Sequence, residues 1–537
     1  MTNHYLPVLI VGAGPTGLMM ACELERHNIP FRIIDKKSSP TQGSNATWIQ
    51  TRTLEILDLI GIADRFLKIG HRCGAINLYE NSKHLVSIPF DSIDSDYPFI
   101  LMLPQSETER LLQARLAESH IRIERSVELI DIKQTNNTVI SIVRLANGDT
   151  ENITSHWVIA CDGANSTIRE KCQIPFPGED IQEQFMVADA TMRSFLPTNE
   201  IHVFFEKGTI FSEKGTLFSA FPWNTKDYRL SANLYSSHPR QFFTEQEVKE
   251  LVAERTYGNY IVEKVSWISP FWIHSKIVNQ MREQSIFLVG DAAHTHSPVG
   301  GQGMNSGLQD AFNLAWKLAL IIQNKAKPAL LDSFPLERHS IVSHVVKETE
   351  YLTKMMLFDK SFFTKLRKFC KNAAKPKIAH SLSMELAQLN IQYNESPIID
   401  YHEKPPTGAP KQGERALDVK ISNTARLFHY FQNTKHQILL FTGIHCTEKN
   451  LKKLEQLQQW LDENYADEIN TYLITTEEAS QANNIISDKN NIIHTRYHLK
   501  TSAIYIIRPD NYIAYFSKKP NEDTLKAFLN EYLIYHG

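Results

Sequence analysis

The chain has 537 residues, enough for about three domains of ordinary size, and its 42% apolar content is typical of globular proteins. With 57 basic and 60 acidic side chains, the net charge of -3 argues against a general nucleic-acid binder. The six cysteines form no Cys-X-X-Cys pair and show no metal-ligand spacing, so we expect reduced thiols and no bound metal.

The first residues give no sign of a signal peptide or a membrane anchor. They lack a charged n-region and a small-residue cleavage site. The apolar run from Val8 to Leu24 is short for a membrane span and is interrupted by a glycine- and proline-containing turn. We therefore expect a cytoplasmic protein that does not bind membranes.

A dinucleotide-binding pattern opens the chain. Residues Leu6 to Val11 form an apolar run typical of a central parallel strand, and an amphipathic helix is predicted to end near His27. Between them stands a Gly-X-Gly-X-X-Gly fingerprint, made of Gly12, Ala13, Gly14, Pro15, Thr16 and Gly17. These glycines permit a tight turn and let a pyrophosphate approach the helix N-terminus. The fingerprint alone does not distinguish NAD from FAD.

A second strand completes this pattern. It runs from Phe31 to Ile34 and is followed by Asp35 and Lys36. An acidic residue at this distance from the fingerprint accepts hydrogen bonds from the adenosine ribose hydroxyls. We therefore include both residues in the predicted cofactor site.

The segment from Ser285 to Ala319 predicts a second ligand-binding turn. Ile286 to Val289 has the composition of a buried strand, and Asp291 follows it, placed to accept hydrogen bonds from sugar-like hydroxyls. Four glycines within eight residues let the backbone approach a flat ligand: Gly300, Gly301, Gly303 and Gly307. The helix beginning near Met304 and Asn305 offers free N–H groups and a positive dipole end. A strand–loop–helix corner without a ligand is the alternative.

A third turn lies between these two segments. Trp157 to Ala160 is predicted to be a buried strand, and Asp162-Gly163 follows it as a tight turn. Ser166 or Thr167 is placed to cap the next helix. A purely structural turn would also explain this segment.

In their order along the chain, the three segments resemble the FAD-binding motifs of the group A flavoprotein aromatic hydroxylases. The third resembles the Asp-Gly motif that the family associates with FAD and nicotinamide binding. The resemblance implies FAD as cofactor and NADPH or NADH as co-substrate. It also implies that Asp162 and Gly163 lie at the cofactor.

Two further segments extend the resemblance. Arg52, within Arg-Thr-Leu-Glu, corresponds to a residue expected to hold the pyrophosphate or the phosphates of the nicotinamide donor, with a surface helix arginine as the alternative. Gln105 matches a glutamine that touches the sugar-phosphate arm of the flavin. The chain departs from the family at Asn45, which is usually arginine, and at Thr47, where relatives of phenol hydroxylase have an aspartate. The second departure weakens a simple-phenol interpretation.

From Phe176 to Trp272 the sequence alternates apolar and polar residues with turns at Lys207-Gly208 and Lys214-Gly215, which predicts an antiparallel sheet. By resemblance this sheet is the substrate domain, inserted between two parts of the FAD-binding domain. Most of its aromatic side chains are expected in the core. As candidates to touch a planar substrate we select Phe204, Phe218 and Trp223.

The predicted fold class is a multidomain combination of α/β and α+β parts. A Rossmann-like FAD-binding domain comprises residues 1–175 and 276–400, and the β-sheet substrate domain comprises residues 176–275. Residues 401–537 form a linker and a C-terminal domain, which resembles the thioredoxin-like domain of the larger hydroxylases. Because its redox Cys-X-X-Cys pair is absent, we expect a structural or interface-forming role.

The activity implied by the resemblance is that of an external monooxygenase acting on a phenolic or polycyclic aromatic compound. NAD(P)H reduces FAD, O2 adds at the flavin C4a, and the distal oxygen of the hydroperoxide attacks the ring. Pro298 and Gly300 are expected near C4a, and the N–H groups near Gly303 and Met304 are expected to stabilise negative charge at the N1/O2 edge. His294 and His296 are candidates for proton transfer or for packing.

Two alternatives remain at this point. The first is a flavoprotein of the same fold that reduces or dehydrogenates without inserting oxygen. The second is a ligand-binding flavoprotein with weak activity, whose C-terminal domain acts in assembly. The expected partners are a small aromatic substrate and O2, and the expected assembly is a monomer or a homodimer.

Overall fold

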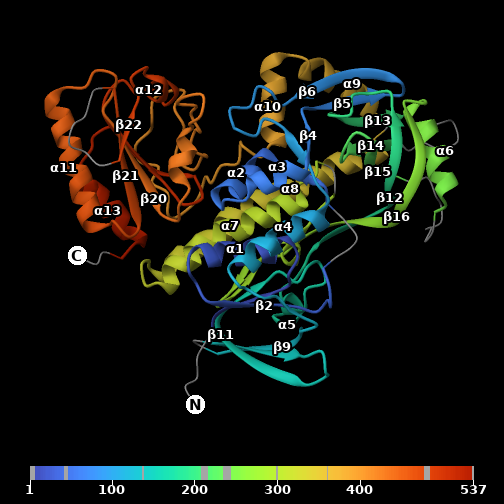
Figure 1. Cartoon of the computed structure of the whole chain (residues 1–537), viewed down its shortest axis with the longest axis horizontal. Coiled ribbons are helices and arrows are strands. Elements are labelled where there is room, and N and C mark those ends of the chain that lie inside the picture. The colour runs from blue at the N-terminus through green and yellow to red at the C-terminus, as the bar shows by residue number, and fades with distance from the viewer. Residues whose placement is uncertain are drawn as a thin grey trace.

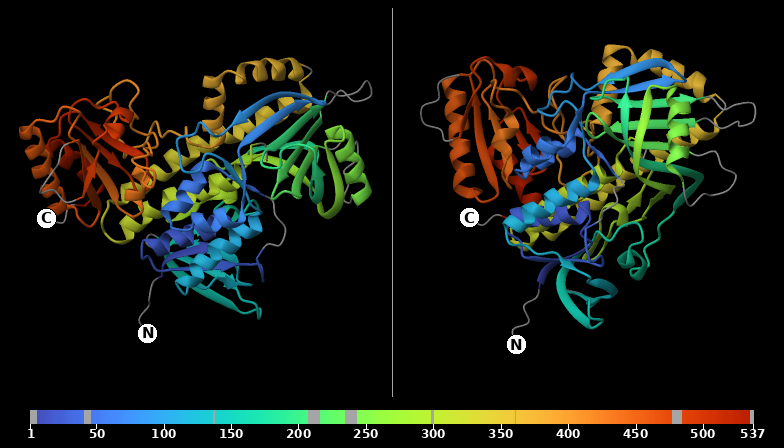
Figure 2. Two further views of the ribbon diagram at one scale, coloured as in Figure 1. Left: turned by 45° about the horizontal axis from the view of Figure 1, so that its top comes forward. Right: turned by 45° about the vertical axis from the view of Figure 1, so that its right-hand side comes forward.

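The chain folds around two large sheets and a smaller C-terminal sheet (Figure 1). The computed structural model describes residues 6–40, 46–135, 138–206, 216–233, 243–297, 300–359, 361–476 and 484–534. The C-terminal unit lies at one end of the molecule and the second sheet at the other (Figures 1 and 2). The predicted turns at Lys207-Gly208 and Lys214-Gly215 lie outside the described residues.

The first sheet has the order β17-β18-β11-β1-β2-β8, and its four central strands run parallel. These are β18 (Ile286–Leu288), β11 (Thr150–Ala160), β1 (Leu6–Val11) and β2 (Phe31–Asp35). The outer strands are β8 (Glu124–Arg125) and β17 (Arg282–Glu283), and β9 (Glu128–Gln134) and β10 (Val139–Arg144) extend from β11. The strands predicted near each glycine-containing turn are therefore confirmed, and they are neighbours.

Three helices accompany this sheet: α1 (Pro15–Arg26), α4 (Gln105–Glu118) and α7 (Gly303–Ile322). Helix α1 packs against both α4 and α7. Residues Leu18 to Ala21, a whole turn of α1, are fully buried because the sheet, α4 and α7 together enclose the helix. The remaining N-terminal helices are α2 (Thr51–Leu59), α3 (Ala63–Ile69) and α5 (Thr167–Lys171).

The second sheet is built on two long antiparallel strands, β12 (Gly178–Ser194) and β16 (Tyr260–Ile277). It continues through β15 (Asp227–Asn233), β14 (Thr216–Pro222) and β13 (Ile201–Glu206), and β19 (His294–Thr295) pairs with the end of β16. Helix α6 (Glu245–Thr256) packs against this sheet, where Val248 and Val252 join its aromatic core. The predicted antiparallel sheet is confirmed.

The predicted domain boundary at residue 175 is wrong in one respect. Strands β5 (Ala75–Glu80) and β6 (Lys83–Pro89) belong to the second sheet, where β5 pairs in parallel with β13. The second sheet thus takes an edge from the N-terminal part of the chain. A small separate sheet is made of β3 (Trp48–Ile49), β7 (Ile100–Met102) and β4 (His71–Cys73). In the sequence β3 and β4 precede β5, and β7 follows β6.

Between α7 and the C-terminal domain the chain is mainly helical. Helices α8 (Ser333–Phe358), α9 (Phe362–Ala373) and α10 (Pro376–Leu386) follow one another, and α9 packs on the second sheet through Phe362 and Phe363. None of the helices in the described ranges is both long and apolar enough to span a membrane. Residues 401–413, the predicted linker, contain no helix or strand.

The C-terminal domain (residues 436–534) forms the sheet β22-β21-β20-β23-β24. Strands β20 (His436–Phe441), β21 (Ile469–Thr475) and β22 (Ile485–Ser487) run parallel, and β23 (Ala503–Ile507) and β24 (Ile513–Ser517) form an antiparallel hairpin. Its helices are α11 (Glu448–Asn464), α12 (Ile492–Arg496) and α13 (Glu522–Tyr532). All six cysteines lie in the described ranges, and none of them forms a disulfide bond there.

One residue of this domain predicts how stability depends on pH. His436 is fully buried in β20, and its Nε2 atom lies 3.1 Å from the Tyr532 hydroxyl. Burial, with a smaller effect of Arg508, lowers the pKa of His436 to about 4. The unfolded chain therefore binds a proton between that value and about pH 6.5 that the folded chain does not, so acid favours unfolding.

Between pH 7 and pH 5 this difference lowers the free energy of unfolding by about 2 kcal/mol. Urea unfolding at pH 7 and pH 5 measures this change. From pH 7 to pH 5 the free energy of unfolding should fall by about 2 kcal/mol less in His436→Gln than in the wild type. The control is His344→Gln, whose side chain is 78% exposed and which should behave like the wild type. Equal losses in the wild type and His436→Gln would contradict the assignment.

Candidate functional site

The three predicted turns meet at one edge of the first sheet. Because β18, β11, β1 and β2 are parallel neighbours, the residues that follow them lie side by side. A Cβ atom on Gly12, whose φ is +102°, would stand 2.2 Å from the carbonyl oxygen of Cys161. The first and third turns are therefore in direct contact.

The segment after β18 contacts the Gly12–Gly17 turn through Thr16. A Cβ atom on Gly290 would lie 2.6 Å from the Thr16 Oγ1 atom, and one on Gly307 would lie 2.4 Å from it. Only glycine allows the turn after β18 and the second turn of α7 to approach α1 this closely. The sequence identified Gly307 by its spacing, but its partner became visible only in the fold.

The N-terminus of α1 faces open space. Gly14 is its N-cap and Pro15 its first residue, and no side chain caps the helix. A Cβ atom on Gly14 would meet no atom within 4 Å, whereas one on Gly17 would stand 1.9 Å from the Gly12 carbonyl oxygen. The first turn thus combines free N–H groups with room for a ligand, which suits a phosphate group.

Three carboxylates surround this edge of the sheet. Asp291 is exposed and makes no hydrogen bond to a described residue. Desolvation by the surrounding protein atoms raises the pKa of its carboxyl group. Asp162 accepts a hydrogen bond from the Ile168 N–H at 3.2 Å, while its Oδ1 atom is buried without a partner. Burial raises the pKa of Asp162 as well. Both groups have unused acceptor capacity, as expected of residues that bind a polar ligand.

Asp35 is more tightly held than these two. Its carboxylate accepts hydrogen bonds from the Ala13 N–H at 2.7 Å and from the Lys37 N–H at 2.8 Å. Lys36 is exposed, and Arg125 of β8 places a guanidinium nitrogen 3.6 Å from Asp35 Oδ1. Asp35 therefore also fixes the glycine turn, and Arg125 is a polar neighbour that the sequence did not indicate.

The glycine-rich loop before α7 packs on an aromatic ring. A Cβ atom on Gly301, whose φ is +61°, would stand 2.6 Å from the ring of Trp48. Helix α7 begins at Gly303 with no side-chain cap, so Gly303 and Met304 have N–H groups without helical acceptors. Gly300 is half-buried in this loop, and Pro298 lies outside the described residues.

The side chain of Asn305 is bound within the protein. Its side chain is fully buried and donates to the carbonyl oxygens of Trp48 and Gly301, each at 2.9 Å. It also accepts a hydrogen bond from the Gln50 N–H at 3.1 Å. The side-chain amide therefore joins β3 to the glycine-rich loop, and the predicted contact of Asn305 with the cofactor stays a prediction for its backbone in the first turn of α7.

The predicted role of Arg52 is also wrong. Its side chain is 1% exposed because protein atoms enclose it, so a cofactor could contact almost none of its surface. The guanidinium pairs with Glu55 at 3.2 Å and donates to the carbonyl oxygen of Asp510 at 2.6 Å. Arg52 thus binds the C-terminal domain. Gln105, in contrast, is half-buried at the start of α4 and donates to Glu109 at 3.0 Å.

Two of the three predicted substrate residues belong to the core. Phe204 is 2% exposed and Phe218 is fully buried, and both pack with the aromatic cluster under α6. Phe221 and Trp223 lie on the opposite face of the sheet because side chains alternate along a strand. Phe221 meets Trp48 edge-on at 5.5 Å, and the Arg229 guanidinium lies 5.1 Å from the Trp223 ring.

The two histidines near Asp291 differ in their surroundings. His294 is buried, and its Nε2 atom lies 2.6 Å from Asp310. The Nδ1 atom of His296 donates to the Ser297 carbonyl oxygen at 2.9 Å, and its Nε2 atom has no hydrogen-bond partner among the described residues. Burial lowers the pKa of His296 to about 4, so this ring is neutral near pH 7.

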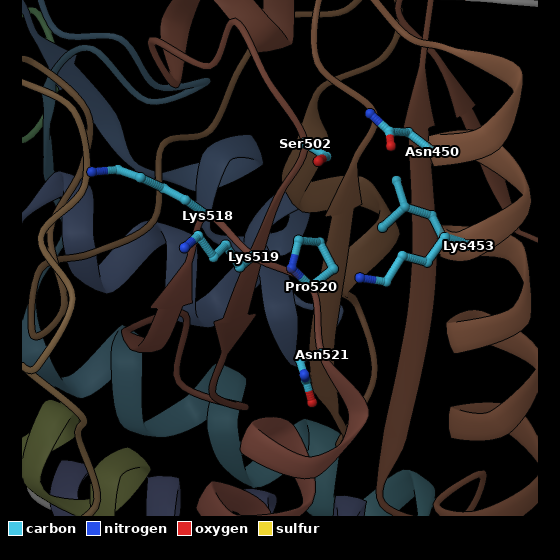
Figure 3. A pocket seen from close by; sticks show the side chains of 8 residues that line it. Asn450, Lys453, Ser502, Lys518, Lys519, Pro520 and Asn521 are labelled. Atoms are coloured by element: carbon cyan, nitrogen blue, oxygen red, sulfur yellow. The ribbon is translucent and has the colours of Figure 1, made fainter.

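A cavity of about 320 Å³ lies elsewhere, in the C-terminal domain (Figure 3). It is bordered by α11 and by the segment that joins β24 to α13, including Lys453 and Lys519. It shares no lining residue with the three turns described above. Among the described residues, no group of three or more His, Cys, Asp or Glu side chains is arranged to hold a metal ion.

Comparisons with known proteins agree with this geometry. Residues 5–349 match the family model described as an FAD binding domain. The chain is 30% identical over 434 residues to the protein named uncharacterized aromatic compound monooxygenase YhjG of Bacillus subtilis strain 168, which covers 79% of this chain and 83% of that protein. It is 28% identical over 460 residues to pentachlorophenol 4-monooxygenase of Sphingobium chlorophenolicum, which covers 84% and 83% of the two chains.

A solved structure extends the similarity to the C-terminal domain. The OxyS anhydrotetracycline hydroxylase from Streptomyces rimosus superposes with a TM-score of 0.74 at 25% identity, over 98% of both chains. The family match covers all three turns, and the strands that carry them are neighbours in one sheet. The chain therefore belongs to the group A FAD-dependent aromatic hydroxylases, a family of flavoprotein monooxygenases.

Proposed function

We propose that this chain hydroxylates a phenolic or polycyclic aromatic compound, with FAD bound where the three turns meet and NADPH or NADH as the electron donor. The observation that carries the proposal is the contact of Thr16 with Gly290 and Gly307, which joins two uncapped helix N-termini at one sheet edge. Two helix N-termini suit a dinucleotide that carries a pyrophosphate and an electron-rich ring.

The residues present fit this cofactor. The turn from Gly12 to Gly17 would hold the pyrophosphate, since the space beside Gly14 is open. Asp35, with Lys36 next to it, would bind the adenosine ribose. Asp291 would accept hydrogen bonds from the ribityl chain, because its carboxylate has no other partner among the described residues. Asp162, Gly163 and Gln105 are assigned to the remaining polar groups of the cofactor on the basis of the family motifs.

When bound, FAD supplies the transfer of electrons from the nicotinamide donor and the activation of O2. The chain contributes binding, orientation and the exclusion of water. The N–H groups of Gly303 and Met304, at the positive end of α7, stabilise negative charge on the nearby ring edge. Gly300 presents no side chain and leaves room for oxygen, and we assign the same place to Pro298 from the family motif.

The substrate is proposed to lie between the glycine-rich loop and the face of the second sheet that carries Phe221 and Trp223. Trp48 connects the two, because its ring contacts both Gly301 and Phe221. Aromatic side chains at right angles to each other present both faces and edges to a planar ring. The names of the relatives include a chlorinated phenol and polycyclic tetracyclines, which agrees with a substrate of this class.

We further propose a thioredoxin-like C-terminal domain, a cytoplasmic location and a monomer or homodimer. The domain assignment rests on a parallel β-α-β unit, β20-α11-β21, that continues into the antiparallel hairpin β23-β24. No nucleic-acid or membrane partner is proposed.

Isotope labelling tests the reaction. The purified protein should be yellow, and aromatic substrates should accelerate its oxidation of NADPH. With 18O2, one labelled oxygen atom should enter the product, as a monooxygenase requires. Consumption of NADPH without labelled product would instead support a reductase or dehydrogenase of the same fold.

Asp291→Ala should weaken the binding of FAD to the apoprotein. Loss of hydrogen bonds to a charged group costs about 1.5–3 kcal/mol, which raises the Kd tenfold or more. The measurement is titration of FAD fluorescence, and the control is Asp91→Ala, which replaces an exposed carboxylate elsewhere. A wild-type Kd for Asp291→Ala would contradict the assigned role.

Gly14→Ala and Gly17→Ala form a matched pair. The φ of −77° and ψ of −176° at Gly14 suit alanine, and the new Cβ atom would enter only open space. Gly14→Ala should therefore change the free energy of unfolding by less than about 1 kcal/mol, yet raise the Kd for FAD at least about tenfold. Gly17→Ala places its Cβ atom against backbone and should destabilise the fold by about 2 kcal/mol or more. Unaltered FAD binding by Gly14→Ala would place the pyrophosphate elsewhere.

Phe221→Ala and Phe218→Leu separate the two faces of the sheet. Phe221→Ala removes an aromatic contact worth about 1 kcal/mol, so the KM of an aromatic substrate should rise roughly fivefold or more at unchanged FAD affinity. Phe218→Leu should instead lower the free energy of unfolding by about 1–2 kcal/mol and leave KM unchanged. Steady-state kinetics and urea unfolding measure both effects. The reverse pattern would move the substrate to the α6 side.

A further inference from the structure

The turn between β23 and β24 carries two buried charges into the FAD-binding part of the molecule. Arg508 is fully buried and Asp510 is 1% exposed. The Arg508 guanidinium donates to Asp510 Oδ1 at 2.9 Å and to Glu337 Oε2 of α8 at 3.0 Å. Arg52 of α2 donates to the carbonyl oxygen of Asp510 at 2.6 Å. The turn is therefore bound by polar contacts to two helices outside its own domain.

Helix α7 is the third helix in this cluster. Lys317 and Asn313 each donate to Glu337 Oε2 at 2.7 Å. Asn313 also donates to Asp510 Oδ2 at 3.3 Å, and the Trp316 indole N–H does so at 3.4 Å. These α7 residues are three and four positions apart, so they lie on one face of the helix. That face is occupied by the C-terminal turn and by Glu337.

One turn earlier on α7, Asp310 binds the segment that contains Asp291. Its Oδ2 atom accepts hydrogen bonds from the Gly290 N–H at 3.2 Å and from His294 Nε2 at 2.6 Å. Its Oδ1 atom accepts from Arg338 of α8 at 2.7 Å. Gly290 and His294 flank Asp291 on both sides. Asp310 thus fixes the turn whose free carboxylate is assigned to the ribityl chain.

Adjacent residues of α8 contact the C-terminal turn and Asp310. Glu337 binds the C-terminal turn, and Arg338 binds Asp310. The Tyr393 hydroxyl lies between them, accepting from Asn313 at 3.3 Å and from Arg338 at 3.4 Å. All of these charged side chains are almost completely buried. If the C-terminal turn were displaced, Glu337 and Lys317 would lose the neighbouring charges of Arg508 and Asp510. Their own charges would then be only partly balanced in a site buried from water.

Buried charges make such a contact specific in position. Removing one partner of a buried ion pair leaves an uncompensated charge, which is far more costly than losing an exposed pair. Arg508 and Lys317 hold the pKa of Glu337 well below its usual value although burial opposes this, and burial lowers the pKa of Lys317 to about 8. The α7–α8 arrangement with every charge compensated is therefore the one in which the C-terminal turn is docked.

We propose that the C-terminal domain is a positioning element of the FAD site. The Arg508–Asp510 turn fixes α7 against α8 through Glu337, and α7 fixes the Asp291 turn through Asp310. Loss of this contact weakens FAD binding, although Arg508 and Asp510 contact helices and not the three glycine-containing turns. The inference rests on the proposed function, because it requires FAD to bind at Asp291.

Asp510→Asn tests the proposal with an isosteric change. The expected result is an increase of about tenfold in the Kd for FAD, a typical coupling between distant sites. The matched control is Asp488→Asn in the same domain, which loses a buried pair with His494 at 2.7 Å that does not involve α7 or α8. The control should lower the free energy of unfolding but keep the Kd within about twofold of the wild type. An equal increase in both variants would overturn the proposal, because general destabilisation of the domain would then explain it.

A double-mutant cycle tests the route through α7. Asp310→Asn should also raise the Kd for FAD, and combining it with Asp510→Asn should add less than the two separate effects, because both act on the same helix. Strictly additive effects would overturn the proposed route.

Hydrogen exchange of the unmodified protein covers the case in which these variants do not fold. Coupling is reciprocal, so FAD must slow exchange in residues 503–517, which include the docked turn, but not in β21. Unchanged exchange in the hairpin would overturn the proposal. If the wild type does not bind FAD, or if Asp291→Ala leaves its Kd unaltered, the proposed function itself fails. If Asp291→Ala weakens binding and Asp510→Asn does not, only the positioning role fails.

Discussion

The contact of Thr16 with Gly290 and Gly307 is the constraint on which the site depends. A side chain at either glycine would separate α1 from α7 or displace the turn after β18. The N-termini of the two helices would then no longer meet at one sheet edge. The parallel order of β18, β11 and β1 creates the edge, but parallel strands alone do not bring helices this close. Because these two glycines have no side chains, α1, α7 and the turn after β18 can lie close enough together to bind a long, flat cofactor.

Helix α7 joins this site to the rest of the molecule. Its first turn offers free N–H groups, its second contacts Thr16, and Asp310, Asn313 and Lys317 engage buried charges farther along. A hydrophobic helix face of the same size would stabilise the fold at least as well, because burying charges is costly. What the charges add is a single alignment of α7 with α8 and the C-terminal turn. Such an alignment matters where a carboxylate such as Asp291 must be held for a ligand.

The sequence predicted the parts of this structure that depend on neighbouring residues. Strand–turn–helix order at the three turns and a cap of α5 by Ser166 or Thr167 follow from local patterns. The structure confirms the order and shows Ser166 as the cap. Arg52 was assigned wrongly because its partner Asp510 is 458 positions away. Strands β5 and β6 were assigned to the FAD-binding domain and not to the second sheet, because the parallel pairing of β5 with β13 leaves no local signal in the sequence. Phe204 and Phe218 were chosen because composition does not reveal which sheet face α6 covers.

The C-terminal domain illustrates how one scaffold can serve a mechanical purpose. It lacks a Cys-X-X-Cys pair, and Cys446 stands alone in its sequence. Redox chemistry of a dithiol is therefore not available to it. Its hairpin nevertheless carries Arg508 and Asp510 into a buried cluster, where an unpaired charge would be strongly unfavourable. Here the two side chains bind a surface formed by α7 and α8. A domain without chemistry of its own can thus determine how well a distant cofactor is held.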